Sequence, residues 1–382
     1  MRPALQLPSA PARRIRRWHT WLLVWRVHRW LGLAAGALLI LLSATGSLLV
    51  VHHELERWFE PDLHVNKRPA GSDAPALADL ARATVPLAPE GYRLFRVVPA
   101  IAPDATHRLV FRAPDAPVRW VAFLEPATGR VLWSGPERSL LTSWLLGLHM
   151  HLHAGRAGTF VAGLGGVALA LLALTGIYIH RDRLTQLWRH PFRLHLGWRV
   201  ALADLHKWIG IFALYFPVVL GVTGALYCLA ILRAPSAAPP ATPFPLAQLA
   251  PLEPMLTTAR ERFPDAEIVR AQMPPQAGGV VSVLLLHRNA PVWQKFSRVD
   301  FDAVTGALRT VRAATDASVR DQFNSMLAPL HFGLHGAAWV KWTYFVGGLT
   351  PGLLTLSGAA IWWIRRRAGA IGQRSTGGSG RR

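Results

Sequence analysis

Residues 25–33 read WRVHRWLGL, and residues 203–211 repeat the pattern as ADLHKWIGI. The repeat is in register at a shift of 178 residues, so that His28 corresponds to His206. Each copy leads into a long apolar run, with a Thr-Gly pair seventeen residues after its histidine. Self-similarity of this kind is the signature of a duplicated architecture. The stretch therefore predicts two similar halves, each beginning with a basic histidine segment ahead of an apolar helix.

Four apolar runs are long enough to cross a bilayer core, which takes about 20 residues of helix. They are Trp30–Val51, Thr159–Ile179, Trp208–Leu232 and Trp342–Ile364. Only 16% of the 382 residues are charged, against roughly 25% in soluble proteins. Many of the 16 tryptophans flank these runs, as in an interfacial aromatic belt. We therefore predict an α-helical integral membrane protein whose four transmembrane helices form an internal two-fold repeat.

The net charge of +21 is concentrated next to the predicted membrane ends. Segments 1–29, 181–207 and 365–382 carry 7, 6 and 6 Lys and Arg residues, against only Asp182 and Asp204. Basic loops mark the cytoplasmic side of a membrane. The pattern predicts a multi-pass membrane protein with both termini and the loop at 181–207 in the cytoplasm. The two long segments between the apolar runs, 52–154 and 232–334, are nearly balanced in charge. Nucleic acid is therefore not an expected partner.

The first apolar run and the cysteine count limit the remaining classes. The run is too long for the 7–15-residue core of a secretory signal peptide, so we expect a retained anchor. Cys228, inside the third run, is the only cysteine. This excludes an intramolecular disulfide, a cysteine zinc cluster and a covalent C-x-x-C-H haem attachment.

Two long segments between the apolar runs are predicted to be α+β modules outside the cytoplasm. Each begins with a helix-like stretch, Pro75–Thr84 or Pro254–Arg262, and continues with strand-like runs separated by Pro and Gly. The runs are Tyr92–Val98, His107–Phe111, Arg119–Leu124, Arg130–Trp133, Glu267–Gln272, Val280–His287, Gln294–Phe301 and Ala307–Val311. A Thr-Gly turn precedes the last run of each module.

These patterns divide the chain into nine parts. We expect a basic N-terminal segment at 1–29, transmembrane helices at 30–51, 155–180, 208–232 and 335–364, outer modules at 52–154 and 233–334, a cytoplasmic loop at 181–207 and a basic tail at 365–382.

Three pairs of histidines among the 16 recur in register between the halves. They are His28 and His206, His149 and His331, and His153 and His335. A single interfacial histidine often binds only water or lipid headgroups. An ionisable residue inside a membrane bundle, however, is costly and suggests function. Two symmetric copies would place imidazoles from facing helices at equal depth.

Helical spacing predicts what surrounds these histidines. At about 100° per residue, His28 shares its helix face with Gly32 and Gly46, which leaves room for a flat cofactor or a helix backbone. The second copy repeats this arrangement. His149 and His153 are one turn apart and should share one helix face, and the spacing predicts the same for their equivalents.

Paired imidazoles can bind several metals. Zinc favours a closed tetrahedral set, usually with Cys or carboxylates, and the predicted helices offer almost none. Copper and nickel accept imidazole and remain possible. Haem takes a histidine on each side of a flat apolar disc, and glycine-lined apolar helices can provide such a slot. His180, at about the depth of His28, is a substitute ligand.

The chain resembles the PepSY-associated transmembrane family. The resemblance rests on the HRWLGL and HKWIGI starts, the paired segments Leu145–His153 and Leu327–His335, and the Thr-Gly turns of the outer modules. It covers nearly all of the chain except the basic N-terminus and the tail. Within the family, the chain is most similar to the FoxB-type di-haem inner-membrane ferrisiderophore reductases. That similarity implies PepSY-like outer modules, two b-type haems and electron transfer to ferric chelates in the periplasm.

We therefore expect a membrane-bound ferric-chelate reductase that carries haem b. The expected ligands are His28 and His206, with His180 in reserve, for an inner haem, and His149, His153, His331 and His335 for an outer haem. The expected partners are a periplasmic ferric siderophore or chelate, the lipid bilayer, and a cytoplasmic or quinol electron donor.

Two other function classes remain open on the sequence. The protein could be a membrane-anchored PepSY regulatory or binding protein with structural histidines. It could also be a histidine-based copper or zinc transporter. Transport would need polar residues at mid-membrane, and the apolar runs offer little beyond Ser43, Thr45, Thr175, Thr223 and Ser357.

Overall fold

The computed structural model describes residues 10–64, 76–100, 105–113, 118–181, 192–234, 244–276, 278–334 and 338–376. Its α-helices are α1 (Ala10–Ala34), α2 (Gly36–Val50), α3 (His52–Phe59), α4 (Leu77–Thr84), α5 (Leu141–His151), α6 (Gly155–His180), α7 (Trp198–Phe212), α8 (Tyr215–Arg233), α9 (Leu252–Arg262), α10 (Val319–Phe332) and α11 (Ala338–Thr376). Its strands are β1 (Arg93–Val98), β2 (His107–Arg112), β3 (Trp120–Leu124), β4 (Val131–Pro136), β5 (Glu267–Gln272), β6 (Val280–Leu286), β7 (Phe296–Asp302) and β8 (Leu308–Arg312).

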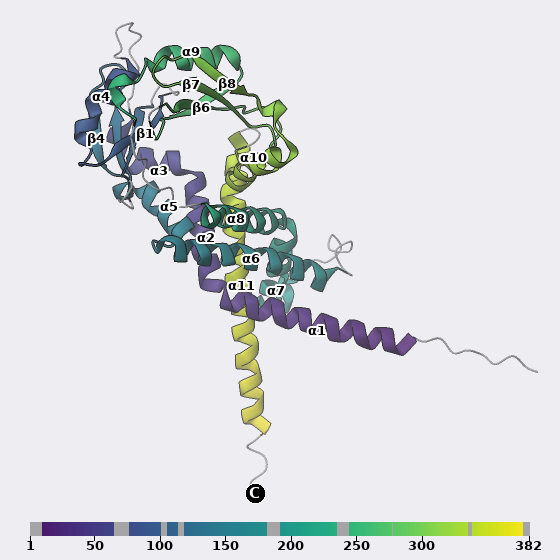
Figure 1. Ribbon diagram of the computed structural model, residues 1–382. Helices are drawn as coiled ribbons and strands as arrows, with labels where there is room; N and C mark the ends of the chain where they lie inside the picture. The colour runs from purple at the N-terminus through teal and green to yellow at the C-terminus, as the bar shows by residue number, and fades with distance from the viewer. Residues whose placement is uncertain are drawn as a thin grey trace, which may run out of the picture. The chain divides into compact units, whose positions relative to one another are not determined.

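The chain forms two compact units, each made of segments distant in sequence. The helical unit comprises Met1–Ser47, Ala154–Leu232 and Tyr344–Arg382, and the sheet unit comprises Leu48–His153 and Arg233–Thr343. Within the described residues, three helices are long and apolar enough to cross a membrane: α6, α8 and the Trp339–Arg367 part of α11 (Figure 1). The bent pair of α1 and α2 makes a fourth if it is counted as one span.

The first predicted crossing, expected as one helix over 30–51, is broken. α1 ends at Ala34, α2 begins at Gly36, and the two axes differ by 64°. With 15 residues, α2 is shorter than the roughly 20 needed to cross a bilayer core. A Cβ atom at Gly36 would lie 3.1 Å from Thr355 Cγ2 of α11, so the glycine permits close contact at the bend.

The third predicted crossing, expected over 208–232, is also interrupted. α7 ends at Phe212 and α8 begins at Tyr215. Pro217, in the first turn of α8, has no backbone N–H and cannot donate to the carbonyl of Ala213, which would continue the helix. His28 and His206 therefore both lie in the helix that precedes a break.

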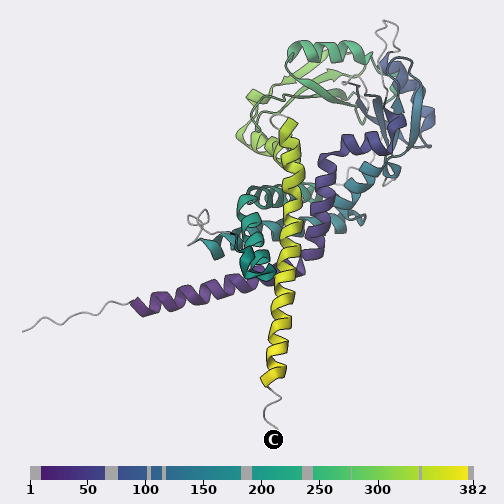
Figure 2. The ribbon, with the colours of Figure 1, turned by 180° about the vertical axis from the view of Figure 1, so that it is seen from behind.

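Small residues bring the helices of the helical unit together. Ser43 Oγ of α2 donates a hydrogen bond to the carbonyl of Gly348 in α11 (2.5 Å) and accepts one from the N–H of Gly352 (3.1 Å); Figure 2 shows these helices side by side. α6 and α8 meet at Gly166 and Gly221, where a Cβ on either glycine would lie within 2.9 Å of the other helix's backbone.

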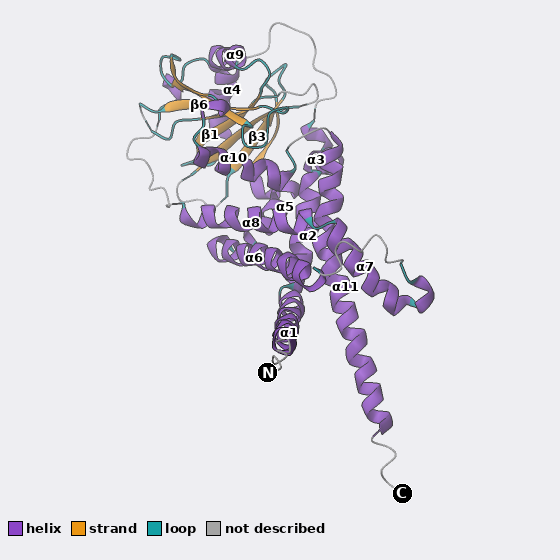
Figure 3. Ribbon diagram, turned by 90° about the vertical axis from the view of Figure 1, so that its right-hand side faces the viewer, coloured by secondary structure: helices purple, strands orange, loops and turns teal. Residues whose placement is uncertain are grey.

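Within its described residues, the sheet unit contains one antiparallel sheet of eight strands in the order β4-β3-β2-β1-β5-β6-β7-β8. Each strand begins within two residues of the strand-like run expected there. The two segments that were expected to form separate outer modules share this sheet, because β1 pairs with β5 at Arg96↔Gln272 and Val97↔Ala271. α4 and α9 cover one face of the sheet (Figure 3). Leu80 and Met255 from these helices are buried there with apolar strand residues.

Candidate functional site

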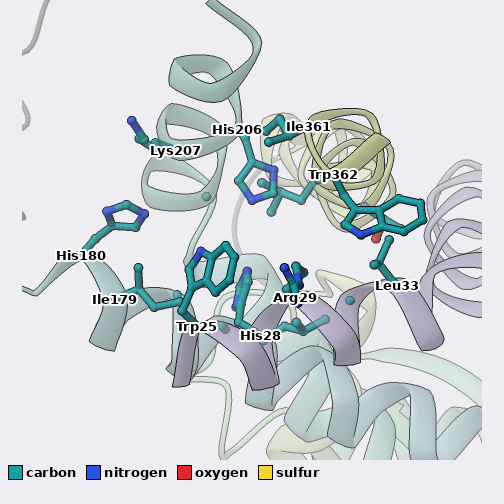
Figure 4. A pocket seen from close by; sticks show the side chains of 18 of the residues that line it. Trp25, His28, Arg29, Leu33, Ile179, His180, His206, Lys207, Ile361 and Trp362 are labelled. Carbon is teal, nitrogen blue, oxygen red and sulfur yellow. The ribbon is translucent and has the colours of Figure 1, made fainter. Parts of the chain in front are cut away.

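A cavity of about 840 Å³ lies within the helical unit and is lined by α1, α2, α6, α7, α8 and α11. Its volume falls in the range of roughly 300–1,000 Å³ that ligand and cofactor sites occupy. The lining is mostly apolar, and it includes His28, His180 and His206. Figure 4 shows the rings of His28 and His206 on opposite sides of the open space, with His180 at its margin. The structure thus brings together the three histidines assigned to an inner site.

His28 is held in one orientation by Thr175 of α6. Its Nδ1 lies 2.8 Å from Thr175 Oγ1. The Thr175 hydroxyl donates its own hydrogen to the carbonyl of Leu171 (2.7 Å), so it can only accept from the imidazole. Nδ1 therefore carries the proton in neutral His28, and Nε2 keeps its lone pair.

His206 has the same arrangement with Ser357 of α11. Its Nδ1 lies 2.8 Å from Ser357 Oγ, and the serine hydroxyl is within 2.8 Å of the carbonyl of Leu353, to which it donates. The imidazole of His206 is thus also a donor at Nδ1 and a potential ligand at Nε2. Two unprotonated Nε2 atoms on opposite sides of one cavity are what an axial ligand pair requires.

A glycine follows each hydroxyl residue and gives the imidazole its space. A Cβ on Gly176 would lie 3.6 Å from His28 Cε1, and a Cβ on Gly358 would lie 3.4 Å from His206 Cε1. The cavity lining also includes Gly32 and Gly210, as their spacing from the histidines indicated. The expected alignment of Gly46 with His28 on one helix face is wrong, because the bend after Ala34 places Gly46 in a different helix.

Basic side chains also line the cavity: Arg29, Lys207, Arg365 and Arg366. The guanidinium of Arg29 stacks 4.6 Å from the ring centre of Trp25, and its Nε is buried without a hydrogen-bond partner. A buried donor that lacks an acceptor is costly, and an anionic group in the cavity would satisfy it. In the sequence, Arg29 is distinguished only as part of the basic segment 1–29 next to the membrane.

The second histidine pair meets within the sheet unit. The ring centres of His149 in α5 and His331 in α10 lie 6.3 Å apart, with the ring planes at 48°. Two metal–imidazole bonds of about 2.0–2.1 Å each, together with the size of two rings, account for a separation of this order. Burial lowers the pKa of His331 to about 3, with a smaller contribution from His149. His331 is therefore neutral at physiological pH, as a metal ligand must be.

The prediction that His149 and His153 share a helix face is wrong. α5 ends at His151, because Leu152 takes the left-handed conformation (φ 48°) and its N–H bonds back to the carbonyls of Gly147 and Leu148. His153 also has positive φ (53°). Its ring packs 5.1 Å from that of Trp144.

The second copy departs from the same expectation. α10 ends at Phe332, and Gly333 takes the left-handed conformation after it (φ 68°). His335 lies outside the described residues. Pro329 lies inside α10 and does not interrupt it. Across the described ranges, no group of three or more His, Cys, Asp and Glu side chains is placed to hold a metal ion. Of the described histidines assigned to the outer site, His149 and His331 meet as a pair.

In the sequence, Thr175 and Ser357 stand out only as rare polar residues of the apolar runs, and their contacts with the histidines were not predicted. A signal was present, because Thr175-Gly176 and Ser357-Gly358 are in register between the halves. That pattern identifies a repeated pair of a hydroxyl residue and glycine. It does not reveal that each pair contacts a histidine on another helix.

Apolar helices and a separate antiparallel sheet fit a membrane protein, and His28 and His206 line a mostly apolar cavity in its helical unit. The chain matches the model of the PepSY-associated TM region over residues 25–365 and belongs to that family, which confirms the resemblance seen in its sequence. It is also similar to an uncharacterized protein of Pseudomonas aeruginosa, with 31% identity over 254 residues. This alignment covers 59% of the chain and 64% of the relative.

Proposed function

We propose that the protein is a haem-containing reductase of the bacterial inner membrane, which moves electrons across the membrane to ferric iron in a periplasmic chelate, such as a ferrisiderophore. One observation carries the proposal. His28 and His206 lie on opposite sides of one apolar cavity, and each has its Nδ1 bound to a hydroxyl oxygen at 2.8 Å. This arrangement leaves two neutral Nε2 atoms for a shared metal.

The residues present fit haem b at this inner site. His28 and His206 would hold it through their Nε2 atoms, while Gly176 and Gly358 leave room beside the two rings. The unpaired Nε of Arg29 and the nearby basic side chains suit the anionic propionates of the cofactor. When bound, haem supplies a one-electron couple whose potential depends on its axial ligands and surroundings.

The chain's own residues prepare this site. Thr175 and Ser357 keep the proton of each imidazole on Nδ1 and so fix the ring orientation. The apolar residues of the cavity exclude water and lower the local dielectric constant. His180 lines the same cavity at the end of α6 and is the reserve ligand.

A second haem would use the pair in the sheet unit. His149 and His331, with ring centres 6.3 Å apart, are the proposed ligands. The low pKa of His331 supports a neutral imidazole there. His153 is the weaker candidate, because it lies beyond the end of α5 and its ring packs on Trp144.

The proposed reaction needs no nucleophile or acid–base pair from the protein. A cytoplasmic or quinol donor gives up one electron for each iron, and Fe³⁺ in the chelate becomes Fe²⁺. Hard oxygen ligands bind Fe²⁺ less tightly, so the iron is released. The basic segments 1–29, 181–207 and 365–382 support a cytoplasmic location of both termini. On this proposed topology, the donor would reach the cavity of His28 and His206 from the cytoplasmic side.

The test is the reduced-minus-oxidised visible spectrum of the purified full-length protein. The expected result is split b-type bands from about two haems per chain. Colourless protein would refute the reductase, and colourless protein with stoichiometric copper or zinc would favour the transporter.

The inner ligands are tested by His28→Ala and His206→Ala, each of which should lose one haem. His180→Ala is the matched control and should keep both. Full haem content in the first two variants would overturn the assignment of the inner ligands.

A further inference from the structure

Arginines gather on the face of the sheet opposite α4 and α9. Val97 of β1 and Ala271 of β5 are fully buried in the core beneath those helices. Because successive strand residues point to opposite faces, the residues directly before them, Arg96 and Arg270, point to the other face. Arg108 of β2 is on that face too, because it lies beside the buried Leu109.

Arg96 and Arg270 occupy equivalent positions at the junction of the two halves. β1 has an irregularity in its register between Leu94 and Arg96, and β5 has one between Ile268 and Arg270. Arg96 lies opposite Gln272 across the β1–β5 ladder. Arg270 is two residues from Gln272 on the same strand, so the two arginines are diagonal neighbours, roughly 7–8 Å apart.

The described acidic side chains do not neutralise these two arginines. Neither guanidinium has a carboxylate partner in the parts of the chain that the structure describes, and Arg96 Nε is buried without any acceptor. Glu137, the nearby carboxylate, pairs with Arg108 at 2.8 Å and with Arg119 at 2.9 Å. Of these four arginines, Arg108 and Arg119 thus have a carboxylate partner among the described residues, and Arg96 and Arg270 have none.

Placing Arg96 and Arg270 together without a counter-ion destabilises the ligand-free protein. Burial, together with the nearby charges of Arg270 and Arg119, lowers the pKa of Arg96 to about 10. Burial also lowers the pKa of Arg270. Like charges placed together without a counter-ion destabilise a fold, and such conflicts occur where a site serves a ligand. Both side chains remain partly exposed, so a solute can reach them.

We propose that this arginine cluster (Arg96, Arg108, Arg119 and Arg270) binds a small anion with at least two carboxylate groups. A guanidinium binds a carboxylate through two parallel hydrogen bonds. The two symmetric arginines, Arg96 and Arg270, each take one carboxylate. The ligand in the proposed reaction is a ferric polycarboxylate chelate, and this part of the inference rests on the proposed function.

The test measures binding of ferric citrate to the full-length protein by calorimetry. Arg96→Gln and Arg270→Gln should each weaken binding by about tenfold or more, because each removes one charge-assisted pair. Arg260→Gln removes an exposed charge from α9, which covers the opposite face of the sheet from the arginine cluster. This variant should leave the Kd for ferric citrate unchanged. Citrate without iron should also bind to the wild-type protein, since its carboxylates make the contacts.

A second measurement separates a ligand site from a structural role. Removing one of two repelling charges should keep or raise the Tm of the ligand-free protein. Lower Tm values for both variants would overturn the proposal, as would an unchanged Kd. Binding of inorganic phosphate as tight as that of ferric citrate would overturn the carboxylate assignment. Haem content reports separately on the proposed reductase, so loss of haem and loss of citrate binding are distinguishable.

Discussion

Ser357 Oγ lies 2.8 Å from Nδ1 of His206, while its hydroxyl bonds to the carbonyl of Leu353 in its own helix. One hydroxyl hydrogen cannot serve both partners, so the imidazole is the donor. α11 thereby determines which nitrogen of a histidine in α7 is free to bind a metal.

Replacing Ser357 with Ala should weaken haem binding at the inner site by roughly 10- to 100-fold, the usual cost of removing the hydrogen-bond partner of a metal-binding histidine. His206 would still be present but would lose its fixed tautomer and orientation. Haem titration of the apoprotein measures the affinity, and a redox titration should show a shifted midpoint of one haem only.

The control for this variant is Thr355→Ala. Thr355 lines the same cavity in the same helix, but its hydroxyl bonds to the carbonyl of Pro351 at 2.8 Å. Equal haem affinity in the Ser357 and Thr355 variants would mean that the bond to His206 has no role in ligation.

The second haem should depend on His149 and His331. Alanine at either position should leave about one haem per chain, because each removes one of two axial ligands. His153→Ala should retain both, since the His153 ring packs on Trp144 beyond the end of α5. Haem extraction and the split of the visible bands measure the result. Loss of haem in the His153 variant alone would reverse the assignment.

Glycine-to-alanine changes should have different effects on stability at Gly221 and at Gly210. At Gly221 a Cβ would lie 2.9 Å from Ala170 N and Gly166 O, backbone atoms that cannot rotate away, so the variant should lose about 1–3 kcal/mol of stability. At Gly210 the nearest atom is a side-chain carbon of Leu354 at 3.7 Å. Alanine there should be neutral or stabilising by up to about 1 kcal/mol. Thermal unfolding of the haem-free protein gives both values.

Acid stability should depend on the contact between α3 and α5. Burial would raise the pKa of Glu56, but the contact with His53 (Nδ1 to Oε2, 3.8 Å), the hydrogen bond from Thr142 and the nearby histidine charges outweigh it and lower the pKa to about 2. A depressed carboxyl pKa stabilises the fold above its unfolded value of about 4.5. That stabilisation is lost as the pH falls from about 4.5 towards 2.

Thr142→Val removes the hydrogen bond that the Thr142 hydroxyl donates to Glu56 Oε1 (2.8 Å). The variant should lose about 1.5–3 kcal/mol at neutral pH, and the difference from wild type should shrink below pH 4.5. In Thr84→Val the lost hydroxyl bonds only to helix carbonyls, so its cost should not change with pH. Tm measured from pH 7 to pH 3 compares the two. Parallel curves for the Thr142 variant and wild type would show that Glu56 is not responsible.

Composition and periodicity predicted the elements that depend on local sequence. The strand-like runs, the apolar helices and the pairing of His28 with His206 follow from spacing and from the duplication. Gly32 and Gly210 were also identified, because helix geometry relates them to a histidine four residues away. These features need only the period of a helix or strand.

The missed features depend on contacts between distant segments or on single backbone angles. The break before Gly36 occurs in an apolar run without proline, and periodicity continues across it. The end of α5 depends on Leu152 in a left-handed conformation, which a leucine rarely adopts. The pairing of β1 with β5 joins two segments that each look complete, so no local pattern predicts it.

That last pairing has a consequence for how the protein folds. Gln272 and the carbonyl of Phe95, which bond across the β1–β5 junction, are 177 residues apart in the chain. α6, α7 and α8 lie between them. On whichever side of the membrane the sheet lies, β1 must wait with an unpaired edge until these helices have been synthesised and inserted. Closure of such a distant pair is slow, and an open strand edge invites aggregation. Biogenesis of the protein should therefore be most vulnerable between the synthesis of its two halves.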